Sequence, residues 1–248
     1  MRRNHARLFT PGPTEVRPEI LQAMSTAQIH HRSPECADLY AELQPKLQKF
    51  LYTEQTVFLF TSSSTGAMEA AVQNCVKKKV LNLVNGAFSR RWAQITEACG
   101  IPNEVLEVPW DVAIKPEQVD EKLRTGKFDA VTLVHNETST GLMNPLEEIA
   151  EVVKQYPDVL LLVDAVSCMG GVKIEFDRLG LDVLLAGVQK AVALPPGLTI
   201  CAVSDRALKR AEEVKPRTYY FSFPVMLKYH KKNQHPTTPS CLLYTSDA

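Results

Sequence analysis

The stretch VLLLVDAV, residues 159–166, is apolar at every position except Asp164. A strand with one face in water alternates apolar and polar residues, whereas a continuous apolar run is typical of a strand buried on both faces. Such strands occur in parallel sheets that are covered by helices. Short runs of the same kind recur along the chain, at residues 57–60, 80–84, 130–134, 182–187 and 198–203.

Stretches with helical spacing of apolar residues separate these runs, at 66–78, 88–99, 116–124 and 146–155. Two more, 18–26 and 35–51, precede the first run. Strands that alternate with helices predict an α/β fold, with a mostly parallel sheet covered by helices. Pro11-Gly12-Pro13 interrupts regular structure, so we expect an extended N-terminal segment at 1–22 and one domain at 23–240.

The composition excludes several classes of protein. Of the 248 residues 45% are hydrophobic and 23% charged, and 28 basic residues balance 28 acidic ones. This balance lacks the basic surface expected of a nucleic-acid binder, and no apolar run reaches the ~18 residues of a membrane helix. The cysteines are scattered without a C-x-x-C pair, and the histidines lack zinc-ligand spacing. We therefore expect no metal site and a reducing, cytoplasmic compartment.

Hydroxyl groups follow the predicted strand 57–60. Ligands of α/β sheets bind at the carboxyl ends of the strands, and here the turn Ser62–Gly66 opens a helix. Hydroxyls and free backbone N–H groups at a helix N-terminus form an anion site, which predicts phosphate binding. An ordinary Ser/Thr helix cap is the alternative. The turn has neither P-loop nor G-x-G-x-x-G spacing, which argues against a nucleotide.

Three further strand ends carry groups that need a partner. Asp164 requires a metal, a buried cationic side chain or a cationic ligand atom if it is buried, unless it only caps the turn. Lys190 lies among Val188, Ala191 and Val192, where apolar surroundings lower the pKa of an amine and make it a nucleophile. A lysine that extends its amine into solvent is the alternative.

The fourth strand end, after residues 130–134, carries a polar cluster formed by His135, Asn136, Thr138, Ser139 and Thr140. By itself this cluster also suits a plain polar turn. An anion site, a buried carboxylate, an amine in an apolar loop and polar donors are together what pyridoxal phosphate requires.

In this order the motifs resemble those of class V aminotransferases, in the fold-type I pyridoxal-phosphate superfamily. The branch with alanine–glyoxylate and serine–pyruvate aminotransferases is the most similar. The resemblance extends from Phe9 to Pro239. It is carried by FTPGPTEVRPEIL (9–21), SSSTGAMEA (62–70), VNGAFSRRW (84–92), HNETSTGLMNPL (135–146), LLLVDAVSCMGG (160–171), GVQKAVALPPGL (187–198) and HPTTP (235–239).

The resemblance implies pyridoxal 5′-phosphate as the cofactor, with Lys190 as the Schiff-base lysine and Asp164 as the partner of the pyridine nitrogen. It places Phe88 and Val166 on the two faces of the cofactor ring and Thr138 near the ring oxygen. The residues implied to bind the phosphate are Ser63, Ser64, Thr65 and Gln189, together with Thr237, which homodimers of the family lend to the neighbouring subunit.

The implied activity is transamination of a small amino acid, of the alanine or serine type, with a 2-oxo acid such as glyoxylate or pyruvate. Two alternatives stay open: a lyase of the cysteine desulfurase or kynureninase type, and an inactive cofactor-binding fragment. Desulfurases have His before the lysine, where this chain has Gln189.

Family members continue into a small C-terminal domain, which carries the arginine that binds the substrate carboxylate. We expect that domain to be missing from this chain. The last eight residues, CLLYTSDA at 241–248, continue no pattern and resemble the translated read-through of a sequencing adapter. We therefore expect a truncated reading frame whose final residues are not native.

Overall fold

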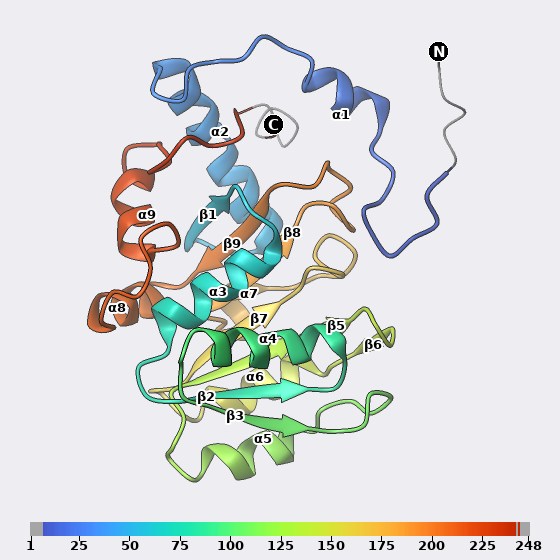
Figure 1. The fold of residues 1–248 in the computed structure, drawn as a ribbon, viewed down its shortest axis with the longest axis vertical. Helices are drawn as coiled ribbons and strands as arrows, with labels where there is room; N and C mark the ends of the chain where they lie inside the picture. The colour runs from blue at the N-terminus through green and yellow to red at the C-terminus, as the bar shows by residue number, and fades with distance from the viewer. Residues whose placement is uncertain (1–6, 242, 244–248) are drawn as a thin grey trace.

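A computed structural model describes residues 7–241 and 243. Its centre is a seven-stranded sheet in the order β1-β9-β8-β7-β4-β2-β3 (Figure 1). β9 is antiparallel to both of its neighbours, and the other six strands run in one direction. The carboxyl ends of the remaining strands therefore lie at the same edge. The strands are β1 Thr56–Phe60, β2 Val80–Val84, β3 Asn103–Glu107, β4 Ala130–Val134, β7 Leu160–Asp164, β8 Val183–Gly187 and β9 Thr199–Val203, and a separate hairpin joins β5 Asn136–Glu137 to β6 Leu142–Met143.

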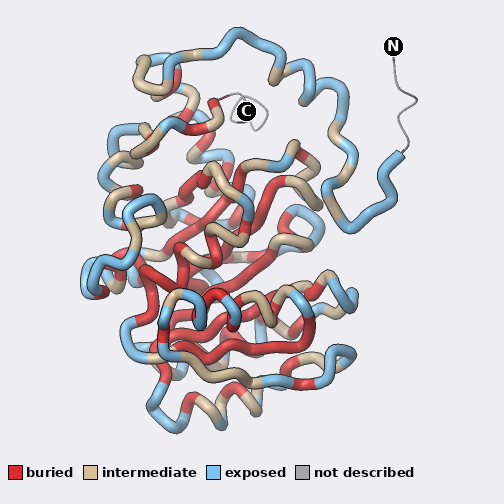
Figure 2. Tube along the Cα trace, viewed as in Figure 1, coloured by how far each residue is buried: buried red, intermediate tan, exposed pale blue. Residues whose placement is uncertain are grey.

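Helices cover both faces of the sheet, and the sheet between them is almost entirely buried (Figure 2). Successive residues of β1 show the two layers, because Val57 and Leu59 join one apolar cluster while Phe58 and Phe60 join the other. The first cluster is closed by α2 Pro34–Leu51, α5 Pro116–Leu123, α6 Leu146–Val153 and α7 Phe176–Leu179. The second is closed by α3 Ser64–Cys75, α4 Ala87–Ala98, α8 Asp205–Glu213 and α9 Phe223–His230.

The structure contains every strand and helix that the sequence predicted, with ends shifted by a few residues. The predicted strand 159–166 stops at Asp164, because Ala165 begins a turn whose carbonyl accepts from Cys168 and Met169. The sequence analysis did not predict β3, the hairpin β5–β6 or the helices α7, α8 and α9. In β3 the edge position leaves most residues partly exposed, so this strand lacks the continuous apolar run of the others.

The first and last described segments differ in how they pack on the sheet. α1 spans Pro18–Ala23, inside the predicted helical stretch 18–26 and across the end of the segment 1–22 that was predicted to be extended, and it buries no side chain. The predicted non-native tail at 241–248 falls mostly outside the described residues. Of the tail residues that are described, Cys241 is buried and Leu243 packs against the first cluster.

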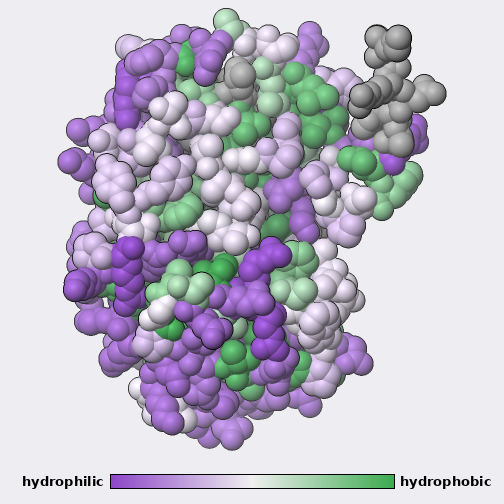
Figure 3. Space-filling view, in the orientation of Figure 1, coloured by the Kyte–Doolittle hydropathy of each residue, from purple (hydrophilic) through white to green (hydrophobic). Residues whose placement is uncertain are grey.

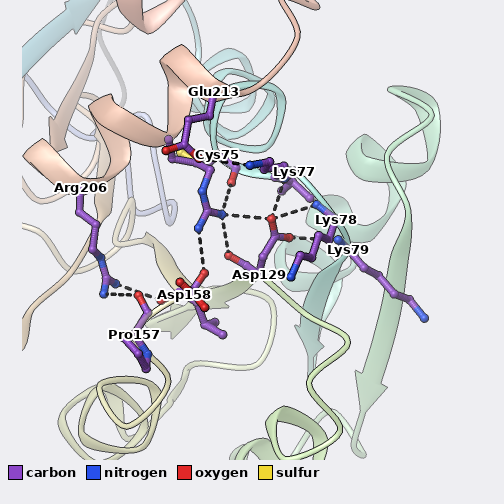
Figure 4. A network of polar contacts seen from close by, with 12 residues as sticks. Cys75, Lys77, Lys78, Lys79, Asp129, Pro157, Asp158, Arg206 and Glu213 are labelled. Atoms are coloured by element: carbon purple, nitrogen blue, oxygen red, sulfur yellow. Dashed lines mark hydrogen bonds and ion pairs between the residues drawn. The ribbon is translucent and has the colours of Figure 1, made fainter.

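A buried carboxylate holds the opposite edge of the sheet together, at the amino ends of the strands. Asp129 precedes β4, and its side chain accepts the backbone N–H groups of Lys77, Lys78 and Lys79 at 2.8–3.0 Å (Figure 4). Arg210 of α8 donates to the same carboxylate at 3.1 Å. Asp129 therefore joins α8 to the starts of β2 and β4.

Replacing Asp129 by Ala is expected to lower the free energy of unfolding by about 3 kcal/mol or more, because Arg210 and three N–H groups lose their buried partner. Urea denaturation of the purified chain measures this change. The same replacement at the exposed Asp111 serves as the control and is expected to cost less than about 0.5 kcal/mol. Equal effects at the two positions would contradict the role of Asp129.

Candidate active site

A pocket lies at the edge where the parallel strands end. It is lined by Ser63, Ser64, Thr65, Met68, Phe88, Arg91, Val134, Asn136, Thr138, Asp164, Val166, Ser167, Gln189 and Lys190. All the residues implied to bind the cofactor are among these, except Thr237. Of the polar cluster after β4, Asn136 and Thr138 line the pocket, whereas His135, Ser139 and Thr140 do not. The Thr237 hydroxyl instead lies 3.3 Å from Nδ1 of His235. The structure thus gathers four separate strand ends into one site.

The hydroxyl-rich turn between β1 and α3 is not used as an ordinary cap. Ser63 occupies the N-cap position of α3, yet its side chain makes no capping hydrogen bond. The Ser64 hydroxyl is buried and has no partner among the described residues. Buried polar groups in native proteins almost always have a partner. This turn therefore has the donors of an anion site in place.

Gly187, at the end of β8, allows two of these polar side chains to converge. A Cβ atom at this position would lie 2.5 Å from the Ser64 Oγ and 2.4 Å from the Gln189 Oε1. Any larger residue would push the serine or the glutamine away. The absence of a side chain on Gly187 therefore keeps the hydroxyl turn next to the loop that carries Lys190.

Asp164 ends β7 and is almost completely buried. Its Oδ1 accepts the backbone N–H of Val166 at 2.8 Å, as a turn cap would. The carboxylate forms no ion pair with any of the residues that the structure describes. Burial raises its pKa from 3.8 to about 6, although the Val166 N–H and the charges of Lys190 and Arg91 act in the opposite direction. A cationic ligand atom next to Asp164 would favour its ionised form.

Lys190 directs its amine into the pocket rather than into solvent. Nζ donates to Oγ1 of Thr138 at 3.3 Å and to Oγ of Ser167 at 3.2 Å. The Thr138 and Ser167 hydroxyls also bond to each other. Nζ lies 5.2 Å from the centre of the Phe88 ring. Burial lowers the pKa of this amine, while the charges of Asp164 and Glu137 raise it. This environment favours a neutral, nucleophilic amine.

Glu137, which the sequence analysis did not single out, places Phe88. Its buried carboxylate accepts the backbone N–H of Ser89 at 2.8 Å and that of Phe88 at 3.3 Å, in the first turn of α4. Ser139 donates to the same carboxylate through its hydroxyl at 2.7 Å. Burial acts to raise the pKa of Glu137, but the hydrogen bonds from Ser139 and Ser89 outweigh it, so the pKa is lowered. An ionised carboxylate suits the N-terminus of a helix.

Four more pocket residues were not predicted from the sequence: Met68, Arg91, Val134 and Ser167. Ser167 follows Asp164 by three residues, and the tight turn after β7 brings its hydroxyl to Lys190. Arg91 lies one helical turn after Phe88 and stacks on that ring at 5.0 Å. Arg91 could have been predicted from the sequence, because residues three apart on a helix lie on the same face and Phe88 was already assigned to the site. Among the described residues no cluster of His, Cys, Asp and Glu suits a metal ion.

Replacing Asp164 by Asn is expected to stabilise the cofactor-free chain above about pH 6. The raised pKa means that the folded chain binds this proton more tightly than the unfolded chain does. The stability associated with Asp164 is thus present below about pH 4 and is lost as the pH rises through about 6. Since one pKa unit corresponds to about 1.4 kcal/mol, the gain at pH 8 is expected to reach up to about 3 kcal/mol.

Urea denaturation at pH 8 and near pH 4 measures this effect, with Asp111→Asn as the exposed control. The advantage of Asp164→Asn should shrink toward pH 4. A variant that is less stable than the parent chain at pH 8 would show that the ionised carboxylate is already well paired in the absence of a ligand.

Comparison with known proteins places this site in a family. The family model for aminotransferase class V matches residues 8–238. The chain belongs to the class V aminotransferases. Members of this family are pyridoxal-phosphate enzymes, and the predicted α/β fold, family and cofactor class are confirmed.

Named relatives of this aminotransferase chain include glyoxylate-using enzymes. The chain is 42% identical over 240 residues to an uncharacterized aminotransferase of Methanocaldococcus jannaschii. This match covers 94% of the chain and 62% of the relative. It is 36% identical over 256 residues to the serine–glyoxylate aminotransferase of Methylorubrum extorquens, covering 98% of this chain and 63% of that enzyme. The chain thus spans less than two thirds of the length of these relatives.

A solved structure has the same fold. The alanine–glyoxylate aminotransferase from Nostoc sp. superposes with a TM-score of 0.90 at 29% sequence identity. The match covers 99% of this chain and 68% of that one. The sheet and the helices that cover it therefore have the same fold in this aminotransferase chain as in that longer chain.

Proposed function

We propose that this chain, as part of its whole protein, performs pyridoxal-phosphate-dependent transamination of a small amino acid of the alanine or serine type with glyoxylate or a similar 2-oxo acid. The observation that carries the proposal is the position of the Lys190 amine. It lies between two hydroxyls, in the same pocket as a buried carboxyl without a cationic partner. The names of the relatives support glyoxylate as acceptor.

The residues present fit pyridoxal 5′-phosphate. The unpartnered Ser64 hydroxyl, with Ser63, Thr65 and Gln189, would hold the phosphate. Asp164 would pair with the pyridine nitrogen, whose positive charge satisfies the buried carboxylate. Phe88 and Val166 would cover the two faces of the ring, with Thr138 near its oxygen. When bound, the cofactor supplies an electron sink for substrate carbon chemistry.

The protein's own residues then divide the remaining tasks. Lys190 would hold the cofactor through its amine, and as a neutral amine it would accept the proton from the substrate α-carbon. Thr138 and Ser167 hold Nζ in place through their hydroxyls. Asp164 would keep the proton on the pyridine nitrogen. Phe88 excludes water from one side of the site.

Homodimerisation and a cytoplasmic location complete the proposal. Thr237 lies outside the pocket of its own chain, which fits a residue that acts on the phosphate of a neighbouring subunit. Apolar side chains also reach the surface near the N-terminal segment (Figure 3), where Phe9 is 92% exposed. A second copy of the chain would cover them.

No helix of the described residues has the length and apolarity to cross a membrane.

Replacing Lys190 by Ala is expected to abolish exchange of the α-hydrogen of alanine or serine with deuterated solvent. The substrate proton then has no acceptor, and general-base catalysis contributes about 10²–10⁴-fold. The assay uses the whole protein of which this chain is part, with added pyridoxal 5′-phosphate, and follows the exchange by NMR, together with glyoxylate-dependent turnover.

Lys173→Ala is the matched control, since Lys173 is exposed and pairs with Glu175 at 3.0 Å. It should exchange at the parental rate. Exchange by Lys190→Ala at that same rate, or none by the parent protein, would sink the proposed function.

A further inference from the structure

The N-terminal segment meets the backbone of the lysine that the pocket is built around. The Thr14 backbone N–H donates to the carbonyl of Gln189 at 3.0 Å. The Thr14 hydroxyl contacts two carbonyls, that of Lys190 at 3.0 Å and that of Gln189 at 3.4 Å. One threonine therefore bonds to both peptide units that carry the reactive side chain, from 176 residues away in the sequence.

Gly12 brings the same segment against the stem of the lysine side chain. A Cβ at Gly12 would lie 2.8 Å from Cγ and 3.5 Å from Cδ of Lys190, and 3.3 Å from the Gln189 carbonyl. Its φ of +139° also belongs to the region that glycine alone adopts readily. Pro11 and Pro13 restrict the backbone on both sides. The segment thus packs closely on the lysine with little freedom to move away.

This contact is not a by-product of a well-packed N-terminal region. Residues 7–13 are exposed except for Gly12, and α1 buries no side chain. Leu8 bonds to Glu15 and Thr10 to Pro13, both within the segment itself. The Thr14 contacts are therefore directed at the lysine turn.

We propose that residues 11–14 form a strap that positions Lys190, with Thr14 as the positioning residue. The inference rests on the proposed function only in taking Lys190 as the cofactor lysine. Thr14 touches neither Nζ nor the ring face of Phe88 in the structure. It acts by fixing the main chain from which Nζ must reach Thr138 and Ser167.

The strap also shields the side chain from water. The Lys190 amine lies at the end of four methylene groups, so a shift of its backbone moves Nζ away from the two hydroxyls. Gly12 covers two of those methylenes. If the strap loosens, water reaches the amine, and its pKa rises toward the ordinary value for lysine.

Thr14→Val keeps the shape of the side chain but removes the hydroxyl that bonds to the two carbonyls. The readout is the pH dependence of acetylation of Lys190 by a trace of acetic anhydride, measured by mass spectrometry of the Lys190 peptide. The cofactor-free 248-residue chain is used. We expect the midpoint to rise by about half a pH unit, which reduces the neutral amine about threefold below the midpoint.

Two variants distinguish positioning from a general effect on the fold. Thr14→Ser restores the hydroxyl and should return the midpoint to that of the parent chain. Thr26→Val removes an exposed hydroxyl that bonds only locally, to the Ala23 carbonyl at 3.2 Å, and should leave the midpoint unchanged. Gly12→Ala, which pushes the strap off the stem, should raise the midpoint as Thr14→Val does.

An unchanged midpoint in Thr14→Val, or an equal rise in Thr26→Val, would overturn the strap. The parent chain is tested separately for covalent binding of pyridoxal 5′-phosphate at Lys190. A parent chain that fails this second test contradicts the proposed function while leaving the labelling comparison intact. A parent chain that passes it, with equal labelling midpoints in all variants, contradicts only the strap.

Discussion

The shared direction of the strands is the constraint on which the site depends. Every strand of the central sheet except β9 ends at the same edge. Residues that are far apart in the sequence, such as Ser64 and Lys190, therefore line one pocket. The opposite edge is closed by Asp129 and Arg210, whose ion pair ties α8 to the starts of two strands. The edge at the amino ends of the strands thus contributes to stability, and the edge at their carboxyl ends carries the pocket.

Two buried carboxyl groups near the pocket have opposite pKa shifts because their surroundings differ. Glu137 accepts hydrogen bonds from two serines and the first turn of α4, and these lower its pKa despite burial. Asp164 has the single bond from Val166, and burial raises its pKa to about 6. Glu137 is therefore satisfied by the protein and serves to place Phe88. Asp164 is left for a ligand, as expected of a group at a functional site.

Much of this arrangement follows from local sequence patterns. Continuous apolar runs predicted the buried strands, and polar residues at their ends predicted most of the pocket, including Asp164 and Lys190. β3 was not predicted because an edge strand does not need two apolar faces. The roles of Glu137 and Ser167 were not predicted, because they depend on partners that only the folded chain brings near. Glu137 bonds to Ser89, and Ser167 bonds to Lys190.

The N-terminal strap marks the limit of such reasoning. Pro11-Gly12-Pro13 predicted only a break in regular structure, which the structure confirms. Nothing in the local pattern says that the next residue, Thr14, bonds to carbonyls 175 and 176 positions later. A contact of this kind is set by the way the chain returns over the edge of the sheet, and it has no periodic signature in the sequence.

The central claim is that the strand ends assemble a covalent cofactor site on Lys190. Borohydride reduction of the chain after incubation with pyridoxal 5′-phosphate, followed by peptide mass spectrometry, tests it most directly. The account predicts that the reduced cofactor is attached to Lys190 at one equivalent per chain. Attachment spread over exposed lysines, or absent from the Lys190 peptide, would contradict it.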